Sequence, residues 1–281
     1  MERFRSRKGE VEIMSIFGKS PVLQELKKLE KEEEKLKKQA ENYQGIKWKE
    51  TLEQKIPPKI FLNLKKAFGK AFEIVFEKGN TIIEKTYTKE ELEKDFQIQD
   101  FAFDLKGKRK ELKKLNAASS KGNFRNLTLS TIEGAGLGIL GIGLPDIVMF
   151  TGMILKGTYE TALCYGFSYE TAGERLFILK VLEASVSKGD TWISCNAEVD
   201  EMLAVPCEKW ITSGENTVNQ QLAQQIVKTG DAFAVDMLAA KFIQGLPLVG
   251  IVGGLSNPVY YHRIMRYVQL KYWKRYLLSK R

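Results

Sequence analysis

The chain of 281 residues is 43% hydrophobic and 28% charged, with a formal net charge of +9. This composition supplies enough apolar surface for one large or two small folded domains, and it excludes a chain that is disordered throughout. The basic balance fits either a solvated lysine-rich surface or an anionic partner, a membrane leaflet or nucleic acid. Lysine dominates the basic residues of the N-terminal half. Because base recognition prefers arginine, no specific nucleic-acid partner is expected.

The three cysteines indicate the cell compartment. Their number is odd and no pair has C-x-x-C spacing, which argues against a disulfide framework and against a thiolate metal site. Residues 1–19 contain acids and no continuous apolar run, so they do not have the pattern of a secretory signal. We therefore expect a cytoplasmic protein with no metal and no cofactor.

The first predicted element is a charged helix. Ser20 and Pro21 form a typical helix start, and glutamate–lysine pairs four residues apart support a helix as far as Tyr43. We accordingly divide the chain into residues 1–45, a basic N-terminal segment with this charged helix, and residues 46–281, a helical domain.

Amphipathic helices follow. Pro57-Pro58 precedes a stripe of phenylalanines in residues 61–76, which predicts a helix with one core-facing side. Thr88 and Glu91 have the capping-box spacing that opens the next helix, whose basic run KGKRKELKK is typical of a solvated face. A polar loop is expected over residues 119–126.

Residues 127–155 are the most apolar and glycine-dense part of the chain, and residues 242–258 repeat their Gly-Leu-Pro sequence. In both segments we expect a helix–tight turn–helix hairpin, in which glycines let two backbones approach closely, and we expect the two hairpins to pack together. The positions assigned to this packing are Gly134, Gly136, Gly138, Gly143, Pro145, Gly245, Pro247, Gly250 and Gly254.

The first glycine-rich segment has other interpretations. Its G-x-G-x-x-G match at residues 136–141 has no preceding strand, so nucleotide binding is not expected. A spanning helix needs about 20 apolar residues, and here Pro145 and Asp146 interrupt the stretch and would place an acid in hydrocarbon. A soluble core hairpin and an interfacial or re-entrant hairpin both remain open.

The remaining pattern is helical. Helices are expected over residues 155–166, 168–189 and 231–242, and residues 190–226 are mixed and polar. No region alternates with the period of a strand, so we predict an all-α fold of about eight helices, a multi-helix domain built around the two glycine-rich hairpins.

Few residues carry recognisable chemistry. Glu133, Asp146 and Glu160 are the candidate functional or ligand-contacting carboxylates, although nothing in the sequence fixes their separation. His262 is the only histidine and has no nucleophile motif beside it. A non-enzymatic protein is therefore favoured. The alternative is a hydrolase or small-ligand enzyme that uses buried carboxylates near Asp146.

The C-terminal tail combines aromatic and basic residues and contains no acid after Arg263. A basic–aromatic helix suits the surface of an anionic membrane, and it equally suits a partly buried helix whose cations extend to solvent. The candidate membrane contacts are Arg263, Arg266, Lys271, Trp273, Lys274 and Arg275.

Three ordered segments, EGAGLGILGIGLPDIVMFTGMILKGTYETALCYGF, ERLFILKVLEA and KFIQGLPLVGIVGGLSNPVYYHRIMRYVQLKYWKRYLL, resemble the EcsC protein family over roughly residues 50 to 278. The family takes its name from an operon that also encodes the subunits of an ABC exporter. The resemblance therefore implies an accessory role near such a transporter and supplies no catalytic residues. We expect a cytoplasmic protein, peripheral at the inner face of the cell membrane, with the anionic membrane surface or transporter subunits as partners. A soluble protein-interaction scaffold is a further alternative.

Overall fold

The computed structural model describes residues 20–43, 57–76, 83–125, 145–205, 209–211, 214–243 and 258–281. Within these ranges the chain is all-α, as predicted, with nine helices and no strand. The helices are α2 (Pro21–Glu41), α4 (Pro58–Ile74), α6 (Lys89–Lys106), α7 (Arg109–Arg125), α8 (Pro145–Cys164), α9 (Ala172–Val186), α10 (Gly189–Leu203), α11 (Glu215–Ile243) and α12 (Pro258–Ser279).

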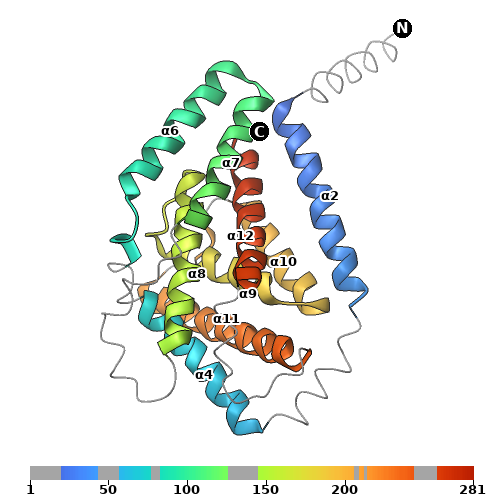
Figure 1. Ribbon diagram of the computed structural model, residues 1–281, viewed down its shortest axis with the longest axis vertical. Coiled ribbons are helices and arrows are strands. Elements are labelled where there is room, and N and C mark those ends of the chain that lie inside the picture. Colours follow the sequence, from blue (N-terminus) through green and yellow to red (C-terminus); the bar gives the residue numbers. More distant parts are fainter. Residues whose placement is uncertain are drawn as a thin grey trace.

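The C-terminal helix α12 lies at the centre of the molecule (Figure 1). It packs against α2, α7, α8 and α9, while α4 and α11 cross each other at the lower end. The apolar residues of α12 do not form one clean stripe, since Val268 and Leu270 point to different sides. Both are buried, because a central helix has neighbours all round it.

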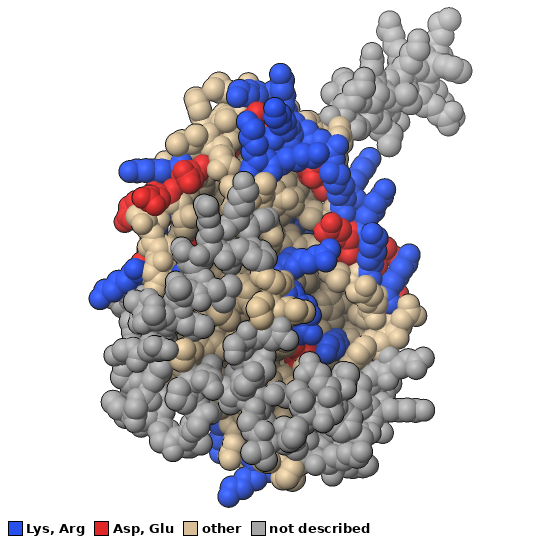
Figure 2. All heavy atoms as spheres, viewed as in Figure 1, with Lys and Arg blue, Asp and Glu red and all other residues tan. Residues whose placement is uncertain are grey.

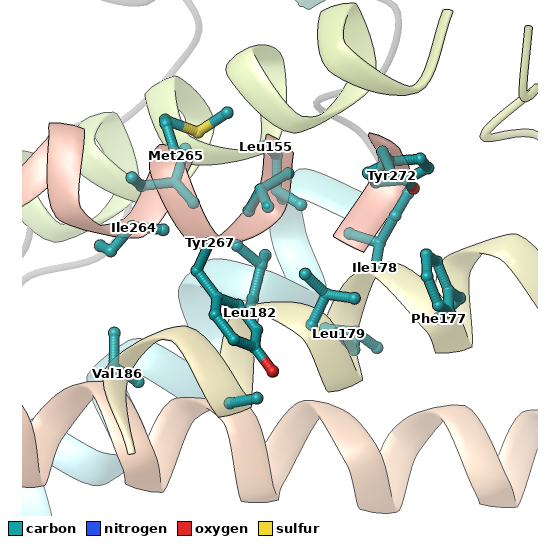
Figure 3. Packing of buried hydrophobic residues seen from close by; sticks show 14 of the residues in the cluster. Leu155, Phe177, Ile178, Leu179, Leu182, Val186, Ile264, Met265, Tyr267 and Tyr272 are labelled. Carbon is teal, nitrogen blue, oxygen red and sulfur yellow. The ribbon is translucent and has the colours of Figure 1, made fainter. Parts of the chain in front are cut away.

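The core is formed where α9, α8 and α12 meet (Figure 3). Phe177 and Leu182 of α9, Leu155 of α8 and Ile264 and Val268 of α12 are each fully buried. Full burial of one such side chain is worth roughly 1.5–3 kcal/mol, so this contact of segments distant in sequence supplies much of the stability.

Glycine ends helix α8. Gly166 has a positive φ of 79°, and the N–H of Phe167 donates to the carbonyl of Ala162 at 2.9 Å, the bond of a Schellman cap. A Cβ on Gly166 would lie 2.3 Å from the ring of Phe96. This position therefore needs glycine both for its backbone angle and for the close packing of α6.

Helix starts agree only in part with the predicted caps. Pro21 occupies the first turn of α2, as expected. Pro58, which was interpreted only as a break before the phenylalanine stripe, occupies the first turn of α4. Thr88 is the N-cap of α6, but its side chain makes no capping hydrogen bond. The bond occurs instead at α9, where the hydroxyl of Thr171 accepts from the N–H of Glu174 at 3.2 Å.

Two polar regions are more helical than predicted. The loop expected over residues 119–126 is wrong as far as Arg125, because α7 continues to that residue. Residues 190–226 contain α10 and the start of α11. Polar runs can be helical when most of their side chains face solvent. Here the few buried groups also find partners, since Gln225 donates to Glu183 at 2.6 Å.

Close glycine contacts occur at positions that the sequence did not single out. A Cβ on Gly230 of α11 would lie 2.6 Å from the backbone nitrogen of Gly69 in α4, and one on Gly157 of α8 would lie 2.3 Å from the hydroxyl of Tyr261. Pro145 is the first residue of α8. The other predicted hairpin positions, in residues 134–143 and 245–254, lie outside the described residues, so the packing of two hairpins stays a prediction.

Candidate functional site

The three candidate carboxylates do not form a common site. Glu133 and the side chain of Asp146 lie outside the described part of the chain, but the backbone of Asp146 belongs to the first turn of α8. Glu160 lies near the other end of the same helix. At 1.5 Å per residue the two positions are about 21 Å apart, so Asp146 and Glu160 cannot act as an acid–base pair.

Glu160 is a buried acid with one cation beside it. It is 7% exposed, and its nearest cation is Lys156, whose Nζ lies 3.7 Å from Oε1. Burial raises the pKa of Glu160 to about 7, although Lys156 opposes the shift. Burial also raises the pKa of the neighbouring Cys164 to about 12, so this thiol is not an activated nucleophile. The described residues around Glu160 thus provide one titrating group without a partner for catalysis.

No metal centre accompanies this acid in the ranges that are described, since no group of three or more His, Cys, Asp or Glu side chains there could hold a metal ion. His262 lies on α12 with its ring centroid 5.8 Å from that of Tyr261.

The predicted membrane contacts of the tail are corrected by the position of α12. Arg263 and Arg266 are exposed, whereas Lys271 is 0% and Trp273 3% exposed. A buried lysine and a buried indole cannot lie on a membrane surface in this fold. The partly buried helix, the other interpretation of the tail, describes α12 correctly.

Lys271 is buried in a four-residue ion-pair cluster. Its Nζ lies 2.8 Å from Oδ1 of Asp200 in α10 and also contacts Glu33 in α2. Lys274 bridges the same two acids, at 2.7 Å to Glu33 and 2.9 Å to Asp200. Burial raises the pKa of Asp200, but the two lysines more than reverse this and hold it below its usual value. The cluster therefore joins three helices that are far apart in sequence.

Arg275 makes a second buried contact, with Glu174 of α9. Its Nη1 lies 2.9 and 2.7 Å from the two carboxylate oxygens, and the hydroxyl of Tyr272 donates to Glu174 at 2.6 Å. The guanidinium also lies 3.8 Å from the ring centroid of Phe167. These contacts use Lys271, Lys274 and Arg275 for internal structure, while Arg263 and Arg266 of the same helix stay exposed.

The most unusual surface lies on α6. Ile98, Phe101 and Leu105 are 67%, 64% and 69% exposed, and their i, i+3, i+7 spacing places them on one face, here called the α6 stripe. The opposite face of α6 packs inward through Phe96 and Phe103. Exposed apolar side chains are ordinary when scattered, whereas three on one helical face form the kind of patch that is typical of interaction surfaces.

A group of exposed lysines, here called the lysine patch, lies at the turn from α6 to α7 and along α7, where basic atoms gather at the top of Figure 2. The patch consists of Lys106, Lys108, Lys110, Lys113 and Lys114. Lys106 and Lys114 pair with Glu111, whereas the other three make no ion pair with any described residue. The acids Asp100 and Asp104 on α6 are themselves paired with Lys280. The three lysines without an ion pair leave positive charge at the α7 end of the α6 stripe, while α6 itself carries the exposed acids Asp95 and Asp104.

The lysine patch is visible in the sequence as the run KGKRKELKK, whereas the α6 stripe was not predicted. The signal was present, because Ile98, Phe101 and Leu105 recur at helical spacing. It was obscured because Phe96 and Phe103 on the other face share the same segment.

Comparison with known proteins gives a family. The model of the EcsC protein family matches residues 20–277. No curated protein and no solved structure matches the chain. The match includes α2, which the resemblance over residues 50 to 278 left out, and α2 packs on α10 and α12. The predicted boundary between residues 45 and 46 falls outside the described residues and stays a prediction.

Proposed function

The chain belongs to the EcsC protein family, and we propose that it is a non-enzymatic accessory protein that attaches peripherally to the anionic inner face of the cell membrane. The observation that carries the proposal is the α6 stripe, three exposed apolar side chains beside the uncompensated lysine patch. Attachment there would bring the chain next to membrane subunits such as those of an ABC exporter, the partner that the family resemblance suggests.

The chemistry of this surface matches a bilayer interface. Apolar side chains enter the boundary between headgroups and acyl chains, and lysines beside them contact anionic headgroups. Moving one large apolar side chain out of water contributes about 1.5–3 kcal/mol, and each lysine near an anionic surface contributes about 1 kcal/mol. The three apolar side chains of the α6 stripe and the three unpaired lysines together are enough for reversible attachment to an anionic membrane. No described helix is long and apolar enough to span a membrane.

The docking surface therefore differs from the one expected in the tail. Lys271, Lys274 and Arg275 are held in ion pairs inside the molecule, whereas the cations of the lysine patch point to solvent. The enzyme alternative cannot pair Asp146 with Glu160, because the two positions lie about 21 Å apart along α8. A pair of Asp146 with Glu133 lies outside the described residues.

Vesicle flotation tests the proposal. We expect the full chain to float with vesicles that contain phosphatidylglycerol, to float less as salt rises, and to float poorly with phosphatidylcholine alone. Phe101→Asp and the double variant Lys108→Glu/Lys110→Glu should each reduce flotation strongly, since they remove the apolar and the electrostatic part respectively.

Two positions on α11 provide matched controls. Val227 is 58% exposed, and Lys228 beside it is exposed. Val227→Asp replaces an apolar side chain by an acid, and Lys228→Glu reverses one charge where the double variant reverses two. Both changes lie away from the α6 stripe, so both variants should float like the wild-type chain. If Phe101→Asp floats as well as Val227→Asp, the α6 stripe is not the docking surface. If the wild-type chain floats with neither lipid, peripheral attachment itself is wrong.

A further inference from the structure

A cavity of about 730 Å³ lies between α2, the junction of α9 and α10, and the first half of α12. Small-molecule sites in proteins usually have volumes of about 300–1,000 Å³. The cavity is on other elements than the α6 stripe, so what it binds can be considered independently of membrane attachment.

The interior of the cavity is largely apolar. The side chains that line it include Leu36, Ala40, Trp192, Tyr267 and Leu270, of which the last four are at most 8% exposed. Three helices contribute them, and such a surface suits a flexible hydrocarbon chain, because it offers dispersion contacts on several sides.

The polar lining of the cavity is predominantly basic. Lys35, Lys188, Arg263 and Arg266 line it from three elements. Glu32 is the one acid among the described lining residues.

These cations are only partly neutralised. Lys188 and Arg263 share a single carboxylate, that of the buried Asp236, whose Oδ1 lies 2.7 Å from the Nζ of Lys188. Lys35 and Arg266 form no ion pair with any described residue and are exposed. Positive charge is thus left over on a largely apolar cavity, the arrangement that recognises an anionic group.

We infer that this cavity binds a single-chain anionic amphiphile, with its acyl chain against Trp192 and Leu270 and its carboxylate or phosphate head on Arg266 and Lys35. A neutral ligand would leave the excess charge unused, and a free anion would leave the apolar interior unfilled. A fatty acid and a lysophospholipid share the required chemistry, and they are distinguished by the test. The inference goes beyond membrane attachment and does not depend on it.

Displacement of a fluorescent ligand tests the inference without any bilayer. Dansyl-labelled undecanoic acid, used below its micelle concentration, should bind the full chain saturably. Palmitate and lysophosphatidic acid should displace it, and the more effective of the two identifies the head group. Monoacylglycerol and inorganic phosphate should compete at least roughly tenfold less well, because each lacks one half of the recognised chemistry.

Variants locate the site. Arg266→Glu reverses one exposed charge at the cavity and should weaken dansyl-acid binding roughly tenfold to a hundredfold, since a charge-assisted hydrogen bond is lost and repulsion added. Lys228→Glu makes the same change on α11 and should bind normally. Ala40→Phe should fill the cavity and abolish binding. Thermal unfolding of Ala40→Phe, followed by circular dichroism, shows whether this variant is folded. If it is not, Arg266→Glu alone tests whether the ligand binds in this cavity.

The results separate the cavity from the docking surface. Phe101→Asp should keep dansyl-acid binding while it loses flotation, and Arg266→Glu should show the reverse. The inference is overturned if the probe does not bind saturably, if Arg266→Glu and Lys228→Glu bind it equally, or if inorganic phosphate competes as well as palmitate.

Discussion

Substitution of the buried acid Glu160 by glutamine should make the protein more stable at neutral pH. In the folded chain the carboxyl group is 7% exposed, and burial raises its pKa from 4.5 to about 7. Glutamine has the shape of the protonated acid and cannot ionise. The variant Glu160→Gln therefore removes a charge that the fold accommodates poorly.

The size of this stabilisation follows from the raised pKa of Glu160. Each pKa unit corresponds to about 1.4 kcal/mol, so the charged form of Glu160 costs the folded state about 3 kcal/mol relative to the unfolded chain. Below about pH 4.5 both states carry the proton and the cost is absent. Between about pH 4.5 and about pH 7 only the folded state keeps the proton, so the free energy of unfolding falls as pH rises. Above that range the full cost is present.

Urea unfolding of both proteins near pH 4.5 and near pH 8 measures this difference. The free energies of unfolding should agree at the lower pH, and Glu160→Gln should exceed the wild type by about 3 kcal/mol at the higher pH. The ionisable groups that face Glu160 are Lys156, Cys164, Tyr87 and Tyr261. They are present in both proteins, as is Glu174, whose pKa burial also raises, so the comparison isolates Glu160. Parallel pH profiles for the two proteins would refute the reasoning.

Urea unfolding at neutral pH checks three further predictions. Gly166→Ala should destabilise the fold by about 2–5 kcal/mol, since it adds a clash with the ring of Phe96 to the strain of a positive φ. Gly107 has a φ of 56° and open space around it, so Gly107→Ala should destabilise the fold by only about 1–2 kcal/mol. Gly230→Ala should cost about 1–3 kcal/mol, because the new methyl group meets the backbone of α4, and its partner Gly69→Ala, with nothing within 4 Å, should be neutral or stabilising. Lys271→Met should lower the free energy of unfolding by about 3–5 kcal/mol, because Glu33 and Asp200 then share one lysine in a largely buried cluster. Equal stability of this variant and the wild type would show that the loss of one lysine leaves no costly unpaired charge in the cluster.

Local sequence patterns were sufficient for the all-α fold. Helix signals that lie within one or two turns can be recognised in the sequence alone. Examples are the phenylalanine stripe of α4 and the prolines at the starts of α2 and α4. The length of α7 was not, because its polar, glycine-bearing end has the composition of a loop and yet continues the helix to Arg125. The break at Gly107 was missed for a similar reason, since one glycine in a helical pattern is often tolerated.

The candidate site was less predictable because it depends on partners distant in the chain. Nothing near Lys271 in sequence indicates that Glu33 and Asp200 would neutralise it. The separation of Asp146 and Glu160 became definite only when both were placed on a single helix, α8. The cavity likewise needs α2, α10 and α12 together, so no local motif marks it.

The ion pairs inside the fold change what the net charge of +9 implies about anionic partners. The tail carries seven cations and no acid from Arg263 onward, yet Lys271, Lys274 and Arg275 face acids inside the fold. Their charge is largely cancelled at short range, and screening by salt hardly reaches a buried pair. The charge that the two proposed anionic partners meet is therefore that of the lysine patch at the membrane and that of Lys35 and Arg266 at the cavity. Since these groups are exposed, both vesicle attachment and amphiphile binding should weaken as salt rises, while the stability of the central ion pairs should change little.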